Sequence, residues 1–461
     1  MEKEKILNEL LVNLHEGILK KWYPLAVDNE YGGYFSNFSY DWKVTPEQDK
    51  MIVTQARHIW TTAKAAAFLN DKSYEEISYH GYYFLTEKMW DSEFGGFYQM
   101  RNRKGDLSGY EGFFDEKRTY GNAYGVFALA ALYEQTGNDQ VLEFAKETFH
   151  WIENHSADKT YNGYFQFLKR KGIPFGKESE YKTKASDAVE ACYKDQNSSI
   201  HLLEAYTELY NVWKSPELYE RLKNILFLIR DTMTNEKGYL HLFFDRKLNP
   251  VSFRNAPEET RGKNYGLDHV SFGHDYETAF LMLEASHALG IKNDTTTLMK
   301  AKKMLDHAID YGWDKNSAGF FDEGYYFTED GNCSIIKDTK VWWAQAESLN
   351  VLLLFSKIFP EEKKYYELFL ELWNYIKQYL IDLDYGDWYW GSLEKEPHYK
   401  TEPKGTIWKG AYHTARTLMN CIQMLADENF DLYTKNDHFK KSKLHFDDFI
   451  EHWKEIAKNL N

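Results

Sequence analysis

Three histidines, His201, His274 and His413, stand near the starts of three separate apolar segments that predict helices. The imidazole ring titrates close to physiological pH, so histidine is well suited to taking up and returning a proton. A single buried histidine is more often a structural residue, since a buried polar group must find a hydrogen-bond partner. Three histidines at equivalent positions of three helices instead predict a shared catalytic role.

The spacing of neighbouring residues adds to this set. Asn197 precedes His201 by four positions and Glu277 follows His274 by three, so each pair shares one face of its helix. Arg57 lies in the first turn of another such helix. A fixed cation aimed at a developing oxyanion contributes about 3–4 kcal/mol to the stability of a transition state, and Arg57 is the candidate for this role.

Other polar and aromatic residues occupy the same first turns. Trp342 and Trp343 lie about 100° apart on a helix, so only one of them is expected to face a common cavity. The remaining first-turn residues are His58, Tyr120, Asn122, Asp275, Glu347, Trp408 and Lys409. If the helices run parallel, all these residues meet at one end of the molecule.

Three histidines could also bind a metal ion. No HxH or HxxxH pair occurs on these helices, and a metal site needs ligand atoms converging within about 2 Å of one ion. We therefore predict proton transfer without a metal.

A repeated signature indicates the elements that hold these residues. Glycine beside aromatic residues recurs at intervals of about 70 residues, which is the length of two helices plus a connecting excursion. The six glycines are Gly33, Gly96, Gly163, Gly238, Gly319 and Gly386. The chain is therefore expected to contain six helical hairpins.

The two helices of each hairpin differ in their apolar pattern. The first helices, such as 139–156 and 362–382, have a one-sided apolar stripe that is typical of an outer layer. The second helices are apolar on all sides, and we expect them near 54–69, 118–136, 196–213, 274–290, 340–358 and 408–426. Six buried helices inside six amphipathic ones predict an all-α (α/α)6 barrel, with short β-hairpins in the excursions, such as 97–117 and 165–195, at the active-site end.

Composition limits the partners and the compartment. Across 461 residues the net charge is −15 without a Lys/Arg stripe, which argues against nucleic acid or an anionic membrane as partner. The chain has neither closely spaced cysteines, nor an apolar signal segment, nor a run of 18 apolar residues, so a cytoplasmic location is expected. Residues 1–426 are expected to form a single barrel domain, and 427–461 an extension with one amphipathic helix near 441–459.

Six stretches resemble one known family. They are Ala56–Trp60, Tyr120–Tyr124, Asn197–Tyr210, Gly273–Ala285, Lys340–Glu347 and Trp408–Arg416. In these stretches the chain is similar to the N-acylglucosamine 2-epimerase superfamily, and within it most closely to the cellobiose 2-epimerases. It departs from them at Ala411, where they usually have proline, and at Thr414, where they usually have asparagine.

The resemblance implies an (α/α)6 barrel and cofactor-free epimerisation or isomerisation of a reducing sugar. It implies that His274 and His413 are the acid/base pair, and that His201 and Glu277 assist ring opening. Other site residues follow by the same resemblance: Arg57 and Asn197 as holders of the sugar oxygens, and Tyr120, Trp343 and Trp408 as the lining of the site.

Several functions remain open on this scaffold. The expected reaction is C2 epimerisation of the reducing glucose or mannose unit of a β-1,4 disaccharide such as cellobiose or mannobiose, by a monomer or homodimer. Alternatives within the superfamily are a mannose/glucose–fructose isomerase and an N-acylglucosamine 2-epimerase. A glycoside hydrolase generally needs two carboxylates flanking the scissile bond, and a non-catalytic sugar-binding protein has no need of three histidines.

Overall fold

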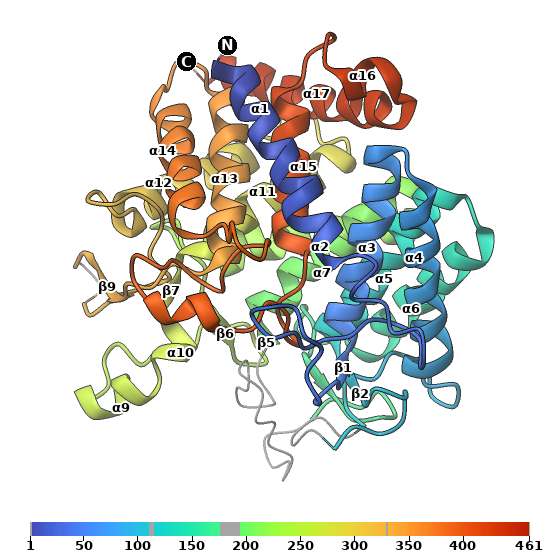
Figure 1. The fold of residues 1–461 in the computed structure, drawn as a ribbon. Coiled ribbons are helices and arrows are strands. Elements are labelled where there is room, and N and C mark those ends of the chain that lie inside the picture. The colour runs from blue at the N-terminus through green and yellow to red at the C-terminus, as the bar shows by residue number, and fades with distance from the viewer. Residues whose placement is uncertain (1, 110–114, 176–193, 329–330, 461) are drawn as a thin grey trace.

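Six inner helices form a closed ring in the computed structural model, which describes residues 2–109, 115–175, 194–328 and 331–460 (Figure 1). Each inner helix packs against the next, and the last packs back against the first. The inner helices are α3 (Ile52–Leu69), α5 (Thr119–Thr136), α7 (Gln196–Val212), α11 (Phe272–Ala288), α13 (Trp342–Ile358) and α15 (Tyr412–Leu425). They are buried on nearly every side, as their uniform apolar pattern predicts.

Six outer helices surround this ring. They are α1 (Glu2–Val12), α4 (Lys72–Phe84), α6 (Asp139–His155), α8 (Pro216–Leu228), α12 (Thr295–Gly312) and α14 (Lys364–Tyr379). Each packs on the inner helix that precedes it in the chain, except α1, which packs on α15 at the far end of the sequence. The (α/α)6 barrel predicted from the repeat is therefore confirmed.

Shorter helical segments complete the chain. Short π-helical segments continue three of the outer helices. They are η1 (Asn13–Leu19) after α1, which leads on to α2 (Lys20–Trp22), η2 (Leu85–Met89) after α4, and η3 (Ile229–Met233) after α8. The other short segments are α9 (Glu258–Lys263), α10 (Tyr265–Asp268), η4 (Pro397–Thr401) and α16 (Asp431–Lys435). Within the described ranges no helix is long and apolar enough to cross a membrane.

Small antiparallel sheets lie at the end of the barrel where the inner helices begin (Figure 1). Three are pairs: β1 (Lys50–Met51) with β2 (Met100–Arg101), β3 (Lys117–Arg118) with β4 (Phe167–Leu168), and β5 (Lys194–Asp195) with β6 (Phe243–Phe244). The fourth contains β7 (Val270–Ser271), β8 (Glu323–Tyr326) and β9 (Cys333–Lys337). Most of these sheets join one excursion to the next. The local hairpins that the sequence predicts are β8 with β9 and shorter ones closed by single bridges, such as Arg101 to Leu107 and Leu168 to Pro174. Residues 110–114 and 176–193 of the predicted excursions lie outside the described residues.

The glycine signatures form tight turns, each closed by a single antiparallel bridge such as Trp90 to Phe97. Gly96 has a φ of 76°, and a Cβ there would come within 2.4 Å of the Trp151 ring, so only glycine fits. The side chain of Asn122, from the first turn of α5, then accepts a hydrogen bond from the Phe97 N–H at 2.7 Å. The turns are thereby fixed to the inner helices that follow them.

Buried Lys–Asp ion pairs recur in the same turns. In four repeats the lysine stands two residues before an inner helix and the aspartate five residues before the signature glycine; the pairs are Lys50–Asp28, Lys117–Asp91, Lys194–Asp158 and Lys340–Asp314. The last repeat has a variant pair, Lys404–Asp382, at 2.6 Å. In the fourth repeat, whose turn is shorter, the corresponding residues are neutral: Val270 stands two residues before α11, and Asn235 directly follows the bridged Thr234, as Asp28 follows Val27. Charge is thus present or absent on both partners together.

The Asp28→Asn variant is expected to lower the free energy of unfolding by about 3–5 kcal/mol, because it leaves the Lys50 ammonium buried without its anion. Both side chains are 0% exposed and lie 2.9 Å apart. Chemical denaturation followed by circular dichroism measures the loss. The double variant Asp28→Asn/Lys50→Val, which reproduces the residues of the fourth repeat, is expected to lose less; an equal or greater loss would contradict the role of the pair.

The same pair makes stability depend on pH. Burial alone would raise the pKa of Asp28, but hydrogen bonds from Arg103 and Lys50 outweigh it and lower that pKa from 3.8 to about 2. The stabilisation by this pair is therefore complete above the pKa that Asp28 has in the unfolded chain. It is lost as the pH falls through the pKa of Asp28 in the folded protein. The stability difference between the wild type and Asp28→Asn is expected to shrink between about pH 4 and pH 2.

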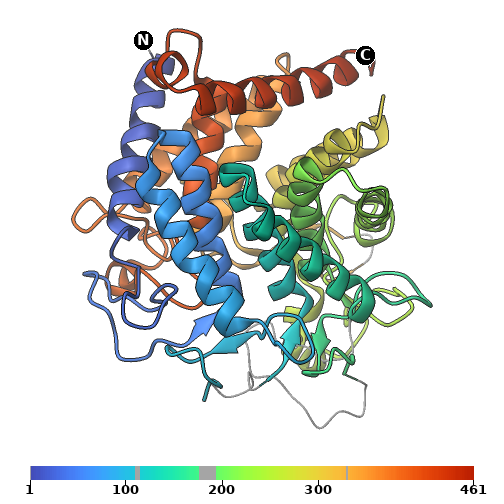
Figure 2. The same ribbon diagram turned by 90° about the vertical axis from the view of Figure 1, so that its right-hand side faces the viewer.

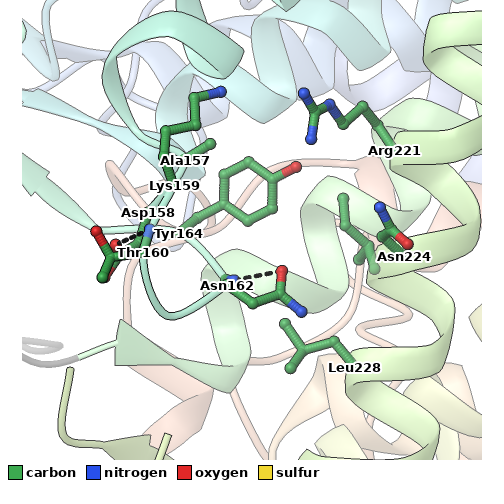
Figure 3. Close-up of a pocket in the computed structure, with 11 residues that line it drawn as sticks. Ala157, Asp158, Lys159, Thr160, Asn162, Tyr164, Arg221, Asn224 and Leu228 are labelled. Carbon is green, nitrogen blue, oxygen red and sulfur yellow. Dashed lines mark hydrogen bonds between the residues drawn. The ribbon is translucent and has the colours of Figure 1, made fainter. Parts of the chain in front are cut away.

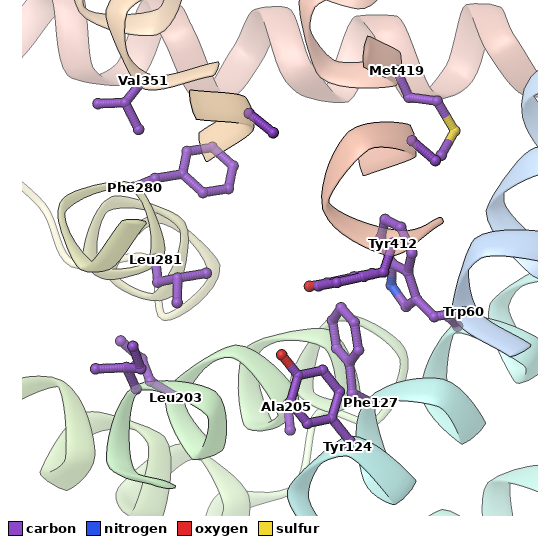
Figure 4. Close-up of a cluster of buried hydrophobic side chains, with 14 of the residues drawn as sticks. Trp60, Tyr124, Phe127, Leu203, Ala205, Phe280, Leu281, Val351, Tyr412 and Met419 are labelled. Carbon is purple, nitrogen blue, oxygen red and sulfur yellow. The ribbon is translucent and has the colours of Figure 1, made fainter. Parts of the chain in front are cut away.

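The opposite end of the barrel is covered by helix α17 (Asp437–Lys458), drawn in red across the top of Figure 2. It packs on α3, α11, α13 and α15. The helix expected near 441–459 is therefore present and begins four residues earlier, where the Asn436 side chain caps it. Between α17 and the ring lies a cavity of about 580 Å³. Trp60, Phe127, Phe280 and Met419 are among the side chains around it (Figure 4).

Candidate active site

The three histidines come together at the end of the barrel where the inner helices begin. His201, His274 and His413 lie in the first or second turns of α7, α11 and α15. The Trp343 ring contacts two of them, with centroids 4.9 Å from His274 and 5.8 Å from His413. Three imidazoles from separate hairpins therefore share one region, as their sequence positions predict.

Each ring is held by its Nδ1 atom. His201 Nδ1 is hydrogen-bonded to Glu204 at 2.8 Å, His274 Nδ1 to the Ser271 hydroxyl at 2.7 Å, and His413 Nδ1 to Glu347 at 2.6 Å. These bonds fix the ring orientations and leave Nε2 of each ring for a bound molecule. A partner on one nitrogen and a substrate on the other is the arrangement that acid–base histidines use.

The three imidazoles are neutral at physiological pH. Burial and, to a smaller extent, the neighbouring histidines lower the pKa of His274 to about 3. Burial likewise lowers the pKa of His413 and of His201, and the charges of Arg57 and Arg416 act in the same direction. A neutral ring can accept a proton without first losing one.

Arg57 lies beside this group as a fixed cation. Its guanidinium donates to the Tyr124 hydroxyl at 2.8 Å and to the Tyr120 hydroxyl at 3.2 Å, and packs over the Tyr124 ring at 4.6 Å. It also points to the Trp408 carbonyl, 3.5 Å away. Its described hydrogen-bond partners are uncharged, so its positive charge is available to a bound anion.

A second arginine, Arg416, joins three buried carboxylates beneath the histidines. Its Nη2 lies 2.8 Å from Glu347 and 3.1 Å from Glu277, and its Nη1 contacts Glu204. Burial would raise the pKa of Glu204, but Arg416 and His201 lower it to about 2. Burial and the nearby Glu347 raise the pKa of Glu277 to about 8, so Glu277 keeps its proton at neutral pH.

Glu277, Glu347 and His413 are also close enough to share a metal ion, with ligand atoms within 4.8 Å of one another. The Arg416 guanidinium already faces both carboxylates. A divalent cation there would meet a fixed positive charge, so this donor set fits an ion-pair network better than a metal centre.

The remaining predicted site residues fall into two groups. Asn197, Trp343 and Trp408 are half-buried at the mouth, and Tyr120 is buried with its ring 5.2 Å from that of His201. Trp342 instead packs against Trp390, so Trp343 alone of the two tryptophans contacts the histidines. The first-turn residues His58, Asn122, Asp275 and Lys409 bond to the surrounding fold.

One predicted helix start is wrong. The helix expected at 408–426 begins at Tyr412. The Thr406 hydroxyl accepts hydrogen bonds from the N–H groups of Trp408 and Lys409 at 3.1 and 3.0 Å. These bonds form a turn in place of the first helical turn. Trp408 therefore reaches the site from this turn.

Sequence reasoning missed the residues that orient the rings. Ser271 and Glu204 each lie three residues from the histidine that they hold, and Arg416 lies three residues after His413. This spacing places each pair on one helical face or at one helix start. It is the sequence pattern that could have indicated these residues.

The Ser271→Ala variant is expected to lower kcat about fivefold with little change in KM, because losing one neutral hydrogen bond costs about 1 kcal/mol. The ring of His274 then loses its orientation while the other contacts of the bound molecule remain. Steady-state kinetics measures kcat and KM separately for the variant and the wild type. Ser271→Thr keeps the hydroxyl and is the matched control; equal activity in the alanine variant and the wild type would show that Ser271 does not orient the ring.

A second cavity lies outside the barrel mouth. It has a volume of about 350 Å³ and lies between the third glycine turn and α8, where Tyr164 and Arg221 face each other (Figure 3). The three histidines do not line it. It is therefore separate from the candidate site.

Comparisons with known proteins show relatives that align over most of this chain. A cellobiose 2-epimerase of Bacteroides fragilis is 28% identical over 430 residues, covering 92% of this chain and 100% of the relative. A D-mannose isomerase of Marinomonas mediterranea is 24% identical, covering 88% of this chain and 94% of the relative. The solved cellobiose 2-epimerase of Bacillus thermoamylovorans is 27% identical with a TM-score of 0.77, covering 91% of this chain and 99% of the other.

The closed double ring and these relatives define an (α/α)6-barrel enzyme of the isomerase class. The family model of N-acylglucosamine 2-epimerase (GlcNAc 2-epimerase) matches residues 33–417. The chain therefore belongs to the N-acylglucosamine 2-epimerase family.

Proposed function

We propose that the protein is a cofactor-independent sugar 2-epimerase that acts on the reducing glucose or mannose unit of a β-1,4 disaccharide. The supporting observation is the arrangement of His274 and His413 about Trp343, each with Nδ1 anchored and Nε2 free. Two imidazoles on opposite faces of one carbon are what inversion at that carbon requires.

The reaction begins with the open-chain aldose. One imidazole removes the C2 proton, and the electron pair moves to form an enediolate with its negative charge on O1. The other imidazole returns a proton to the opposite face of C2, which inverts the centre. A positioned acid or base of this kind contributes about 10²–10⁴ in rate.

The hydrogen-bond partners give the two rings different resting roles. Burial raises the pKa of Glu347, and in its protonated form this carboxyl donates a hydrogen bond to His413 Nδ1 and passes its proton there as Nε2 gives one up. His413 then carries its own proton on Nε2 and acts as the donor. Ser271 can instead accept from His274 Nδ1, which leaves a lone pair on His274 Nε2 and makes it the base.

Other side chains support the intermediate. Arg57 stabilises the charge on O1, and Asn197 holds a neighbouring hydroxyl. His201 and the protonated Glu277 assist ring opening by proton exchange with the ring oxygen and O1. Trp343 and Trp408, which are half-buried, stack on the apolar faces of the sugar.

The choice of substrate rests on the relatives. The Bacteroides fragilis and Bacillus thermoamylovorans proteins are both cellobiose 2-epimerases and align over about nine-tenths of this chain. The second candidate is a mannose–fructose isomerase, favoured by the D-mannose isomerase that aligns over 88% of the chain. The two reactions share one enediolate and differ only in whether the proton returns to C2 or to C1.

One experiment separates these reactions. The protein is incubated in D₂O with cellobiose, mannobiose, mannose and N-acetylglucosamine in turn, and each mixture is followed by NMR. We expect deuterium at C2 and the inverted aldose from cellobiose or mannobiose. A ketose product would favour the isomerase, a new reducing end would indicate a hydrolase, and no exchange with any of the sugars would contradict the proposal.

A further inference from the structure

The cavity under α17 extends along the barrel axis from the charge network beneath the histidines. Glu284, which lines it, follows Glu277 by seven positions and therefore shares its face of α11. Glu208 likewise follows Glu204 by four positions on α7. Glu204 and Arg416 also line the cavity. Residues of the network that holds the histidines therefore form the inner wall of a second space at the opposite end of the barrel.

This cavity is large enough for a small molecule and opens beside α17. Its volume of about 580 Å³ is within the range of about 300–1,000 Å³ that is typical of ligand sites. Two lysines that line it, Lys214 and Lys441, are exposed. Lys214 Nζ lies 4.0 Å from the centre of the Tyr210 ring. These two charges are therefore at the opening and not in the interior.

Apolar side chains form one part of the wall. Phe127, Phe280 and Met419 lie around the space shown in Figure 4. The Trp60 ring is stacked on Phe127 with centroids 5.3 Å apart and meets the Tyr412 ring at 5.1 Å. Since these two rings already pack against Trp60, it does not offer a free face to a sugar. The wall therefore favours an apolar ligand body over a second sugar.

Carboxyl groups outnumber cations in the inner part of the wall. This part contains three carboxyls and two cations: Glu204, Glu208, Glu284, Lys64 and Arg416. Lys64 is shared between Glu208 and Glu134, with its Nζ 2.5 Å from the latter. Arg416 pairs with Glu204. Glu284 is left without a cation among the described residues.

Glu284 is the group that a ligand would complete. No described residue donates a hydrogen bond to its carboxyl. Burial, aided by the charges of Glu208 and Glu204 and opposed by that of Arg416, raises the pKa of Glu284 to about 8. A cation beside this carboxyl would favour its charged form, whereas an anion would meet the negative charges of Glu204 and Glu208.

We propose that the cavity is a second ligand site, which binds a small organic amine with an apolar body. The ammonium group lies between Glu284 and Glu208, on the neighbouring helices α11 and α7, and the apolar body lies against Phe280 and Met419. Hydrogen bonds between an ammonium and carboxylates are charge-assisted and stronger than neutral ones. Binding at this site does not depend on the proposed sugar reaction, since it can be measured without a sugar.

Calorimetric titration of the full-length protein with phenethylamine tests the site. At about pH 8.5 the amine keeps its charge, as a lysine side chain does, and Glu284 is largely ionised. One amine per chain is expected to bind. Phenethyl alcohol has the same shape without the charge and is expected to bind at least tenfold more weakly, and hydrocinnamate, an anion of similar size, not at all. Equal binding of the amine and the alcohol, tighter binding of the anion, or no saturable binding of the amine would overturn the proposal.

Three variants locate the bound amine. Glu284→Gln keeps the shape of the side chain and is expected to weaken amine binding at least tenfold. Glu371→Gln, at an exposed position of α14, is the matched control and is expected to keep the affinity of the wild type. His274→Ala is also expected to keep it, since His274 does not line this cavity. Unchanged affinity in Glu284→Gln, or loss of binding in His274→Ala, would place the amine elsewhere and overturn the proposal. The three probes test the site in the wild type as well, so the outcome does not depend on the folding of any variant.

Discussion

The His413→Ala variant is expected to stop epimerisation while still exchanging the C2 proton of one sugar epimer with solvent. In the proposed two-base reaction, His274 can remove a proton from one face of C2 and return it to the same face. Epimer formation is expected to fall by about 10²–10⁴-fold, which is the contribution of one positioned acid or base. Deuterium uptake and epimer formation, measured separately by NMR in D₂O, distinguish the two events.

The His274→Ala variant gives the mirror-image result. It is expected to exchange the C2 proton of the other epimer only, because His413 serves the opposite face. His398→Ala is the control, since His398 is exposed and its described side-chain contacts are with Glu396 and Tyr399. Equal exchange of both epimers by either variant would show that the two histidines do not serve opposite faces.

The Arg416→Met variant is expected to lower both the stability and the activity of the protein. Methionine fills similar space but leaves the buried Glu204 carboxylate without its cation, and removing one partner of a buried ion pair costs about 3–5 kcal/mol. Since Glu204 and Glu347 hold His201 and His413, kcat is expected to fall with the free energy of unfolding.

A pH profile separates the electrostatic role of Arg416 from simple misfolding. Without the guanidinium, the pKa of Glu347 is expected to rise, so the alkaline limb of kcat, where this carboxyl loses its proton, moves to higher pH. Arg416→Lys keeps the charge and is expected to retain more stability than the methionine variant, although it cannot reach all three carboxylates. An unshifted profile in folded Arg416→Met protein would contradict the proposed network.

The arrangement of the helices was predictable from the chain because the two layers have different apolar patterns. The inner helices are apolar on all sides, and the outer ones have a single stripe, so their alternation predicts a ring within a ring. The convergence of His201, His274 and His413 follows from that geometry alone. Trp343 was one of two equivalent candidates, and only the packing of Trp342 on Trp390 distinguishes them.

Features that depend on local competition or on distant charges were not predictable. The start of α15 depends on one hydroxyl, that of Thr406, taking backbone N–H groups that a helix would otherwise use. The Lys–Asp pairs join residues more than 20 positions apart, such as Lys50 and Asp28, and become visible only when the repeats are aligned. Arg416 stands on a buried helix, where a lone cation gives no sign of the three carboxylates that surround it.

The packing of α1 on α15 has a consequence for synthesis of the protein on the ribosome. Helix α1 meets its partner only after about 400 further residues have been translated, so its apolar stripe stays exposed during that time or is covered by a chaperone. A nascent chain that is released before α15 is complete cannot close the ring at all. We therefore expect C-terminal truncations that remove α15 to yield aggregation-prone fragments, and not smaller folded barrels.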